Sequence, residues 1–331
     1  MPKFSVIVPV YNRPDELDEL LESLVDQTYQ DFETVIVEDG STIKSDKVVE
    51  KYRESLNIEY HYKENEGQGF ARNYGYSRAS GEYFIVFDSD CIVPEHYLEN
   101  VNDFLEKDWV DAFGGPDTFH PKFTVLQKTI SHTMTSFLTT GGIRGKRKVV
   151  RGFHPRSFNM GISREVFEKT KGYKIPFMGE DMEFSTRILK EGFRTALIPE
   201  AYVYHKRRTS LWKFAMQLKY FGRARINLTR FHKRQFHLIH LLPLVFTIGF
   251  ISMLALTIAG HILGMIATAL FGVYSLIIFI EGWLKTKSFL ASLISPVIVV
   301  VQFSFYSYGL VYEWIRKIMG IDPNTKYIEL Y

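Results

Sequence analysis

The segment FSVIVPVYNRPDELDELLESLVDQ (Phe4–Gln27) places an apolar run directly before an amphipathic one. Residues 4–10 are mostly Val, Ile and Phe, a composition typical of a buried β-strand. Pro14 occupies a favoured position at the start of a helix. It is followed at helical spacing by Leu17, Leu20, Leu21 and Leu24. The segment therefore predicts a strand at 4–10 and a helix at 14–27.

The same alternation continues along the front half of the chain. Further strands are predicted at 33–39, 57–62 and 83–88, and further helices at 45–55 and 68–79. Strands that alternate with helices over short loops form an α/β fold with a mostly parallel, doubly wound sheet. Such sheets bind ligands at the carboxyl ends of their strands. We therefore expect the polar clusters YNR, EDGS and DSD, which follow the first, second and fourth strands, to meet at one edge.

The length and the N-terminus limit the class of protein. A chain of 331 residues is long enough for one large domain or a domain with an appendage. Its single cysteine, Cys91, excludes an internal disulfide framework and suits a reducing compartment. The apolar run at 4–10 is too short for a signal peptide and contains Pro9. We therefore expect the front half to remain in the cytoplasm.

The C-terminal region has the composition of a membrane segment. Residues 235–280 contain no Asp, Glu, Lys or Arg. Because one span needs about 20 apolar residues, we expect two spans with a turn near Gly260. Basic residues flank both ends, which favours a hairpin with both ends in the cytoplasm. A second uncharged run, 288–312, fits either a third span or an element in the membrane interface, and Arg316 beyond it conflicts with a simple third crossing.

Two aspartates, Asp88 and Asp90, end the fourth predicted strand. In an extended chain alternate side chains point the same way, and paired carboxylates suit Mg²⁺ or Mn²⁺ that also bridges a diphosphate. The alternative is a solvated polar turn, since the D-x-D pattern is common. Asp39, after the second strand, can accept hydrogen bonds from a ligand or form an Asx turn.

Other polar positions also have two interpretations. Glu180 and Asp181 precede a helical pattern, so they either cap the helix or supply a general base that faces the metal site. His205 follows a strand-like run and is either structural or a metal ligand. Arg72 lies in a helical stretch and would matter if it reached phosphates at the same edge. Neither a nicotinamide-type nor a Walker-type phosphate motif is present.

Seven motifs in order resemble a known family, the inverting family 2 glycosyltransferases with a GT-A fold. They are VIVPVYNR, VEDGS, NEGQGFARNYG, GEYFIVFDSD, SFNMGISREVFEKTKGY, GEDMEFSTRILKEGFR and IPEAYVYH. The resemblance covers about residues 3–206. It implies transfer of a sugar from a nucleotide-diphospho-sugar to an acceptor hydroxyl, with UDP as the commonest nucleotide and GDP or dTDP as alternatives.

The resemblance implies roles at the matching positions. The catalytic base would be Asp181, with Glu180 beside it. A Mn²⁺ or Mg²⁺ ion would be bound by Asp88, Asp90 and His205. The nucleotide-sugar would be bordered by Pro9, Tyr11, Asp39, Arg72 and Asp88. The acceptor side would include Asn159 and Gly161. After Gln217 the Q-x-x-R-W signature of processive synthases is absent, which favours one sugar per acceptor, and the glutamate of VEDGS replaces the family's usual aspartate.

A basic segment separates the front half from the membrane region. Residues 206–234 contain ten Lys and Arg and no acid, alternating with apolar residues, which predicts an interfacial helix on anionic lipid near a lipid-linked acceptor. A solvated charged face is the alternative. Nucleic-acid binding is disfavoured because the charge adjoins a membrane segment. We expect a GT-A catalytic domain at 1–206, the basic interfacial segment at 207–234 and a membrane-associated region at 235–331.

These patterns favour a membrane-anchored, metal-dependent glycosyltransferase of cell-surface glycan assembly. A nucleotidyltransferase would also pair carboxylates with a nucleotide, but it would release pyrophosphate. A catalytically silent subunit that binds nucleotide-sugar is a third alternative, which the intact Asp88, Asp90 and Asp181 disfavour. The sequence carries no pattern that specifies the sugar, the linkage or the oligomeric state.

Overall fold

The chain consists of two compact units. The computed structural model describes residues 1–118, 120, 123–141 and 150–321. The first unit contains the described parts of Met1–His120 and Lys146–Lys206. The second contains the described parts of Pro121–Gly145 and Arg207–Pro323, so a segment from the middle of the sequence belongs with the C-terminal region.

The first unit alternates strands and helices in the predicted order. Its strands are β1 (Phe4–Val10), β2 (Phe32–Asp39), β3 (Ile58–Lys63), β4 (Tyr83–Phe87), β5 (Cys91–Ile92), β6 (Ala112–Gly114), β7 (Asp117–Thr118), β8 (Val150–Arg151), β9 (Asn159–Ser163), β10 (Thr195–Leu197) and β11 (Val203–His205). Its helices are α1 (Pro14–Val25), α2 (Asp46–Glu50), α3 (Gln68–Arg78), α4 (Tyr97–Lys107), α7 (Arg164–Thr170) and α8 (Glu180–Lys190).

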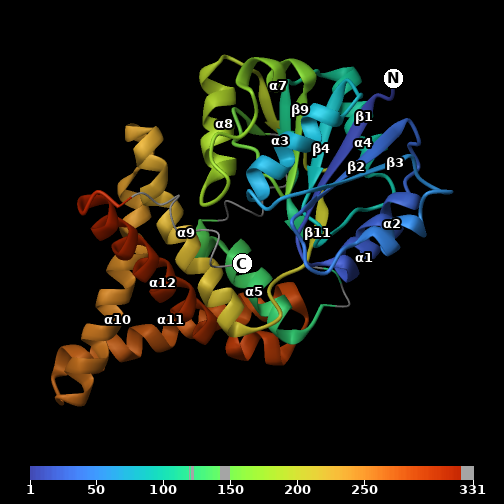
Figure 1. The fold of residues 1–331 in the computed structure, drawn as a ribbon. Helices are drawn as coiled ribbons and strands as arrows, with labels where there is room; N and C mark the ends of the chain where they lie inside the picture. The colour runs from blue at the N-terminus through green and yellow to red at the C-terminus, as the bar shows by residue number, and fades with distance from the viewer. Residues whose placement is uncertain (119, 121–122, 142–149, 322–331) are drawn as a thin grey trace. The chain divides into compact units, whose positions relative to one another are not determined.

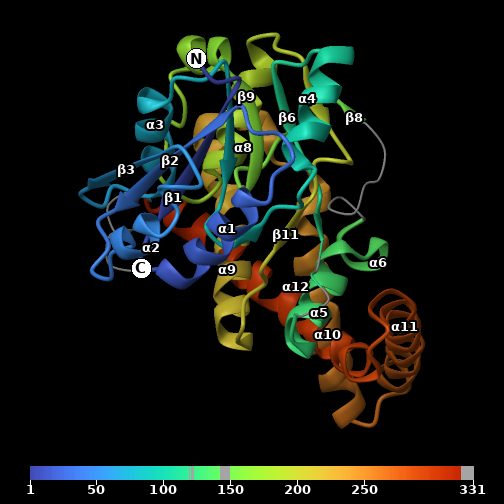
Figure 2. The same ribbon diagram turned by 90° about the vertical axis from the view of Figure 1, so that its right-hand side faces the viewer.

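Eight strands form the main sheet in the order β3-β2-β1-β4-β9-β6-β10-β8 (Figure 1). The pairs β3–β2, β2–β1, β1–β4 and β6–β10 are parallel, whereas β9 is antiparallel to both neighbours and β8 to β10. Apolar residues of α1, α2 and α4 pack on one face, and those of α3, α7 and α8 on the other (Figure 2). The prediction of a mostly parallel, doubly wound GT-A-type sheet is confirmed.

Two local predictions differ from the structure. The helix expected at 45–55 is only Asp46–Glu50, because the chain then turns: the Ser55 and Leu56 amides both donate to the Tyr52 carbonyl. The turn buries Leu56 in the core. The extended geometry expected at 88–90 is also wrong. The Cys91 amide donates to the Asp88 carbonyl at 3.0 Å, so these residues form a tight turn.

A second, small sheet adjoins the end of β4, in the order β5-β11-β7. In β11, His205 pairs with Cys91 of β5, and Val203 pairs with Asp117 of β7. Three segments far apart in the sequence thus meet just beyond the turn at Asp88–Cys91.

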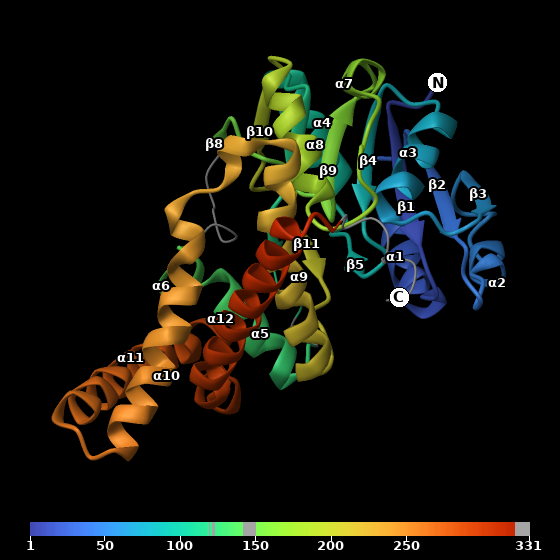
Figure 3. The same cartoon turned by 60° about the vertical axis from the view of Figure 1, so that its left-hand side comes forward.

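The second unit is helical (Figure 3). It contains α5 (Val125–Thr135), α6 (Phe137–Thr140), α9 (Leu211–Phe231), η1 (Lys233–Gln235), η2 (Leu238–Leu241), α10 (Leu242–Ile258), α11 (Ile262–Thr286) and α12 (Phe289–Ile318). Among the residues that the structure describes, three helical segments are long and apolar enough to cross a membrane: Leu238–Ile258, α11 and α12. The first two meet at a turn that contains Gly260, whose φ of 69° is readily adopted by glycine.

Candidate active site

Three polar clusters gather at one edge of the main sheet, as the sequence predicts. The Asn12 amide, in the loop after β1, donates to the Ser41 hydroxyl after β2 at 2.7 Å. Arg13, in the same loop, donates to Asp90 after β4 at 3.2 Å. The clusters YNR, EDGS and DSD are therefore in direct contact, and this prediction is confirmed.

Asp90 and His205 form one end of the candidate site. The Asp90 Oδ1 lies 3.0 Å from Nε2 of His205, which stacks on the Phe158 ring. Both side chains are largely buried, with exposed fractions of 9% and 13%. The pairing of His205 with Cys91 in the small sheet produces this approach, because it sets the residue next to Asp90 opposite the imidazole. A carboxylate and an imidazole that converge in this way can bind one metal ion.

Asp117, which the sequence did not suggest, and Arg13, which belongs to the predicted YNR cluster, extend this pair at its two ends. Asp117 of β7 places its Oδ2 3.9 Å from Nδ1 of His205, on the side opposite Asp90. Arg13 contacts the Asp90 Oδ2 and also binds Glu16 at 2.8 Å. Such neighbours orient metal ligands and set the imidazole tautomer. The result is a row of side chains in the order Asp117, His205, Asp90, Arg13.

Cys91 lies beside this pair, and ligand atoms of Asp90, Cys91 and His205 all lie within 4.8 Å of one another. Burial, together with the nearby charges of Asp90 and Asp88, raises the pKa of the Cys91 thiol well above its usual value. The thiol therefore stays protonated and donates weakly to the Phe158 carbonyl. Because metals bind the thiolate, Asp90 and His205 are the better donor pair for Mn²⁺ or Mg²⁺.

Arg72 of α3 connects the turn after β4 with the start of α8. Its guanidinium donates to Asp88 Oδ1 at 2.7 Å and to Glu180 Oε1 at 3.4 Å, and its side chain is 1% exposed. Burial opposes the charge of Arg72, but Asp88, Tyr173 and Glu180 outweigh burial and keep its pKa above the usual value. Arg72 thus holds two carboxylates that come from distant parts of the sequence.

Replacing Arg72 with methionine should lower the free energy of unfolding by about 3–5 kcal/mol, because two carboxylates would lose their buried cation. Chemical denaturation in detergent measures this loss. The matched control is Arg78→Met on the exposed side of the same helix, where the guanidinium binds only the Tyr74 hydroxyl among the contacts described for it. A surface change of this kind costs about 0.5 kcal/mol or less. Equal losses in the two variants would contradict the buried bridge.

Glu180 and Asp181 open α8 immediately after Gly179, whose φ is 95°. Glu180 is buried and accepts from the Gln68 side chain. Asp181 is half-buried, and its Oδ1 accepts from the Met182 amide at 2.7 Å. Burial and the negative charge of Asp181 raise the pKa of Glu180 to about 7. The two neighbouring acids therefore differ in role: Glu180 faces Arg72 inside the fold, and Asp181 is the more accessible.

The raised pKa of Glu180 predicts a pH dependence of stability. Between the ordinary glutamate pKa of 4.5 and the raised pKa of about 7, the folded state binds more protons at this group than the unfolded state. The free energy of unfolding should therefore fall as the pH rises through this interval and level off above it. Denaturation at pH 5 and pH 8 measures the slope. Glu180→Gln should flatten it, and an unchanged slope in this variant would assign the effect to another group.

The proposed nucleotide side lies at the ends of β1 and β2. Pro9 and Tyr11 are half-buried at the end of β1. Asp39 is 3% exposed, and its carboxylate accepts from the Glu66 and Gly67 amides at 3.1 and 2.9 Å. It also pairs with Lys63 at 2.9 Å. Asp39 therefore fixes the loop before α3, and a nucleotide contact by this residue stays a prediction.

Asn159 and Gly161 lie in the central strand β9. Asn159 is fully buried, and its side-chain oxygen and nitrogen bond to the Tyr97 hydroxyl and the Ala201 carbonyl. A Cβ at position 161 would fall 2.0 Å from the Phe113 ring, so only glycine fits. The structure gives both residues a packing role, and an acceptor contact by either of them stays a prediction.

Known proteins resemble this chain in sequence and in fold. The family model "Glycosyl transferase family 2" matches residues 5–171. The minor teichoic acid biosynthesis protein GgaB of Bacillus subtilis (strain 168) is 29% identical over 65% of this chain. The poly(ribitol-phosphate) beta-N-acetylglucosaminyltransferase TarS of Staphylococcus aureus (strain Mu50 / ATCC 700699) is 33% identical over 41%. The matches span only 24% and 27% of the lengths of these relatives.

Two solved structures are similar in fold. The mannosyltransferase PcManGT from Pyrobaculum calidifontis, in complex with GDP-Man and Mn²⁺, superposes with a TM-score of 0.63 and 19% identity. That match covers 91% of this chain and 87% of the mannosyltransferase. The crystal structure of S. aureus TarS gives a TM-score of 0.50 and 23% identity over 71% of this chain and 44% of TarS. At these identities the similarity concerns the fold.

Proposed function

Because the chain belongs to glycosyl transferase family 2, we propose that it transfers a sugar from a nucleotide-diphospho-sugar to an acceptor hydroxyl with inversion at the anomeric carbon. The observation that supports this best is the gathering of carboxylates at one edge of the main sheet. Asp90 contacts His205, and Arg72 joins Asp88 to Glu180, the residue beside Asp181. The accessible carboxylate of Asp181 would serve as the one base that a single displacement at the anomeric carbon needs.

The side chains at this edge of the sheet would have separate roles in binding metal and nucleotide. Asp90 and His205 would bind Mn²⁺ or Mg²⁺, with Asp88 facing the same space or the ribose. When bound, such an ion neutralises a diphosphate leaving group. Arg13 and Asp117 would hold Asp90 and His205 in orientation. Asp39, Pro9, Tyr11 and the loop fixed by Asp39 would border the nucleotide.

Asp181 would act as the general base. Its carboxylate would take the proton of the acceptor hydroxyl as that oxygen forms a bond to the anomeric carbon. The bond from this carbon to the diphosphate breaks on the opposite face, and the nucleoside diphosphate leaves. A single displacement inverts the anomeric configuration. Glu180, held by Arg72 and Gln68, would keep the start of α8 in position for this step.

We propose a UDP-sugar as donor and a lipid-linked or otherwise membrane-held glycan as acceptor. The apolar helices of the second unit support a membrane location for the acceptor. Two relatives are named as a teichoic acid biosynthesis protein and a poly(ribitol-phosphate) beta-N-acetylglucosaminyltransferase. These names support a cell-surface polymer as a second class of acceptor. The first unit, which we call the catalytic unit, would lie in the cytoplasm, where nucleotide-sugars are available.

The test is a thermal-shift panel on the detergent-solubilised full chain. UDP-, GDP- and dTDP-sugars are added with and without Mn²⁺, and any stabilising donor is then assayed for transfer to lipid-linked sugar and to soluble poly(ribitol phosphate). We expect one nucleotide class to stabilise the protein only with metal and to release a nucleoside diphosphate on transfer. Release of pyrophosphate would identify a nucleotidyltransferase instead. Donor binding without transfer to any acceptor would favour a silent subunit.

A further inference from the structure

Helix α12 differs from the other two long apolar helices in how it is packed. Among their most apolar windows, 39% of the residues are buried in α12, against 6% in Leu238–Ile258 and 11% in α11. The buried face of α12 carries polar side chains, including Ser295, Gln302 and Glu313. A helix that turns a polar face inward has protein partners along that face, and those partners restrict where it can lie in a membrane.

The first partner is α9, which runs parallel to α12 with their backbones in contact. A Cβ on Gly222 would fall 2.0 Å from the Tyr306 carbonyl, and one on Gly309 would fall 2.0 Å from the Lys219 carbonyl. Early in α9, Phe214 and Leu218 pack with Ile298 of α12. Late in α9, Arg230 binds Glu313 at 3.0 Å.

Charge prevents α9 from crossing a bilayer. Its 21 residues include Lys213, Lys219, Arg223, Arg225 and Arg230, and each basic side chain is costly at the membrane centre. The carboxylate of Glu313, which is fully buried on α12, forms ion pairs with Arg223 and Arg230 at 3.0 Å each. The part of α12 that accompanies α9 must therefore stay outside the hydrocarbon centre with it.

The second partner is α5, which holds the first half of α12. The Thr129 hydroxyl donates to the Ala291 carbonyl at 3.1 Å, and His132 Nδ1 lies 3.2 Å from the Ser295 hydroxyl. The α5 side chain Gln127 also donates to the Arg207 carbonyl, at the entry to α9. Both partners connect to the catalytic unit within a few residues, at 120–125 and at 206–211. Both therefore lie on one side of the membrane.

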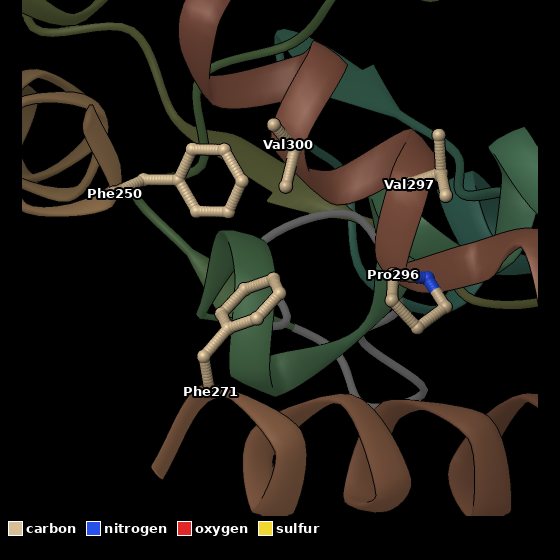
Figure 4. Close-up of a pocket in the computed structure, with 5 residues that line it drawn as sticks. All are labelled: Phe250, Phe271, Pro296, Val297 and Val300. Atoms are coloured by element: carbon tan, nitrogen blue, oxygen red, sulfur yellow. The ribbon is translucent and has the colours of Figure 1, made fainter. Parts of the chain in front are cut away.

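The hairpin of α10 and α11 contacts α12 at described positions that run from its open end to its middle. Thr247 lies 3.1 Å from Ser307 between hydroxyl oxygens, and the Phe279 and Phe289 rings are 5.6 Å apart. A small apolar hollow of about 210 Å³ lies where the three helices meet, lined by Phe250, Phe271, Pro296, Val297 and Val300 (Figure 4). The turn that joins α10 to α11 extends away from α12 (Figure 3).

We propose that α10 and α11 cross the bilayer as a hairpin, whereas α12 lies in the membrane interface on the same side as α9 and inserts its outer face into the lipid. That face is exposed and apolar, with Leu290, Leu293, Ile315 and Ile318. The partner of this surface is the bilayer itself, at the boundary of headgroups and acyl chains. The basic residues of 206–234 on the same side suit anionic headgroups. The proposal concerns topology and does not depend on the proposed reaction.

Single cysteines and a membrane-impermeant maleimide test the proposal in sealed vesicles of known orientation. The native Cys91 is fully buried and serves as an unlabelled background. Glu54→Cys marks the catalytic unit, His261→Cys the turn of the hairpin and Met319→Cys the end of α12. We expect the cysteines at 54 and 319 to react from one side of the membrane and the cysteine at 261 from the other.

Two outcomes would overturn the proposal. If the cysteine at 319 reacts from the same side as that at 261, α12 crosses the membrane. If the cysteine at 261 reacts from the same side as that at 54, the hairpin does not cross. Ile258→Cys and Gly320→Cys repeat the comparison at exposed neighbouring positions, so that failure of one variant to fold does not remove the test. Retained thermal stability of each variant in detergent is the control for native structure.

Discussion

Replacing Asp181 with asparagine is expected to lower the rate of sugar transfer by about 10²- to 10⁴-fold, the usual contribution of a general base. Asparagine keeps the size of the side chain and its acceptor oxygen for the Met182 amide, so the start of α8 should remain intact. Donor binding should change little, because Asp181 would act on the acceptor. Transfer rates under saturating donor, together with donor affinity by calorimetry, measure the two effects separately.

The matched control for this change is Glu165→Gln. Glu165 is also an acid in the first turn of a helix of the catalytic unit, but it is exposed on α7. Its replacement removes the same negative charge at a position outside the candidate site, so the transfer rate should be unchanged. If Asp181→Asn transferred sugar as fast as the wild type, the base would have to be another group.

Replacing Asp90 with alanine should weaken Mn²⁺ binding, and with it metal-dependent donor binding, by at least about 100-fold. Loss of a residue that only orients a ligand typically costs 10- to 100-fold, and Asp90 lies in direct contact with both His205 and Arg13. Titration of Mn²⁺ followed by its paramagnetic resonance signal measures this affinity without any assay of transfer.

A graded control distinguishes ligands from residues that orient them. Asp117→Asn leaves Asp90 and His205 in place but removes the negative charge near Nδ1 of His205, so Mn²⁺ affinity should fall by about 10- to 100-fold. Equal affinity in the wild type and Asp90→Ala would show that this carboxylate holds no metal. A larger loss in Asp117→Asn than in Asp90→Ala would reverse the two roles.

The meeting of the YNR, EDGS and DSD clusters could be predicted because parallel strands end at a common edge. That rule needs only the order of strands and helices, which apolar patterns reveal in long elements such as β1 and α1. The role of Asp117 could not be predicted in the same way. It depends on β7 and β11, strands of two or three residues, which are too short to show a period of two.

The contacts of Arg72 with Asp88 and Glu180 could not be predicted from the sequence for a different reason. Its partners Asp88 and Glu180 are 16 and 108 residues away in sequence, and each has an ordinary local explanation as a turn residue or a helix cap. Pairing of this kind depends on tertiary packing rather than on a local pattern. Tertiary contacts of the basic segment were equally unpredictable. Its composition predicted an interfacial helix on lipid, and the structure shows in addition that Arg223 and Arg230 pair with the buried Glu313.

The placement of α5 has a practical consequence for dissecting the protein. This helix comes from the middle of the sequence, yet it packs with α9, α11 and α12, and its apolar residues Ile130 and Met134 share a core with Phe214 and Ile298. A fragment that stops after Lys206 would keep α5 but discard α9, α11 and α12, and would expose the apolar surface on which they pack. A soluble catalytic fragment should instead omit residues 121–145 as well, with a short flexible linker in their place.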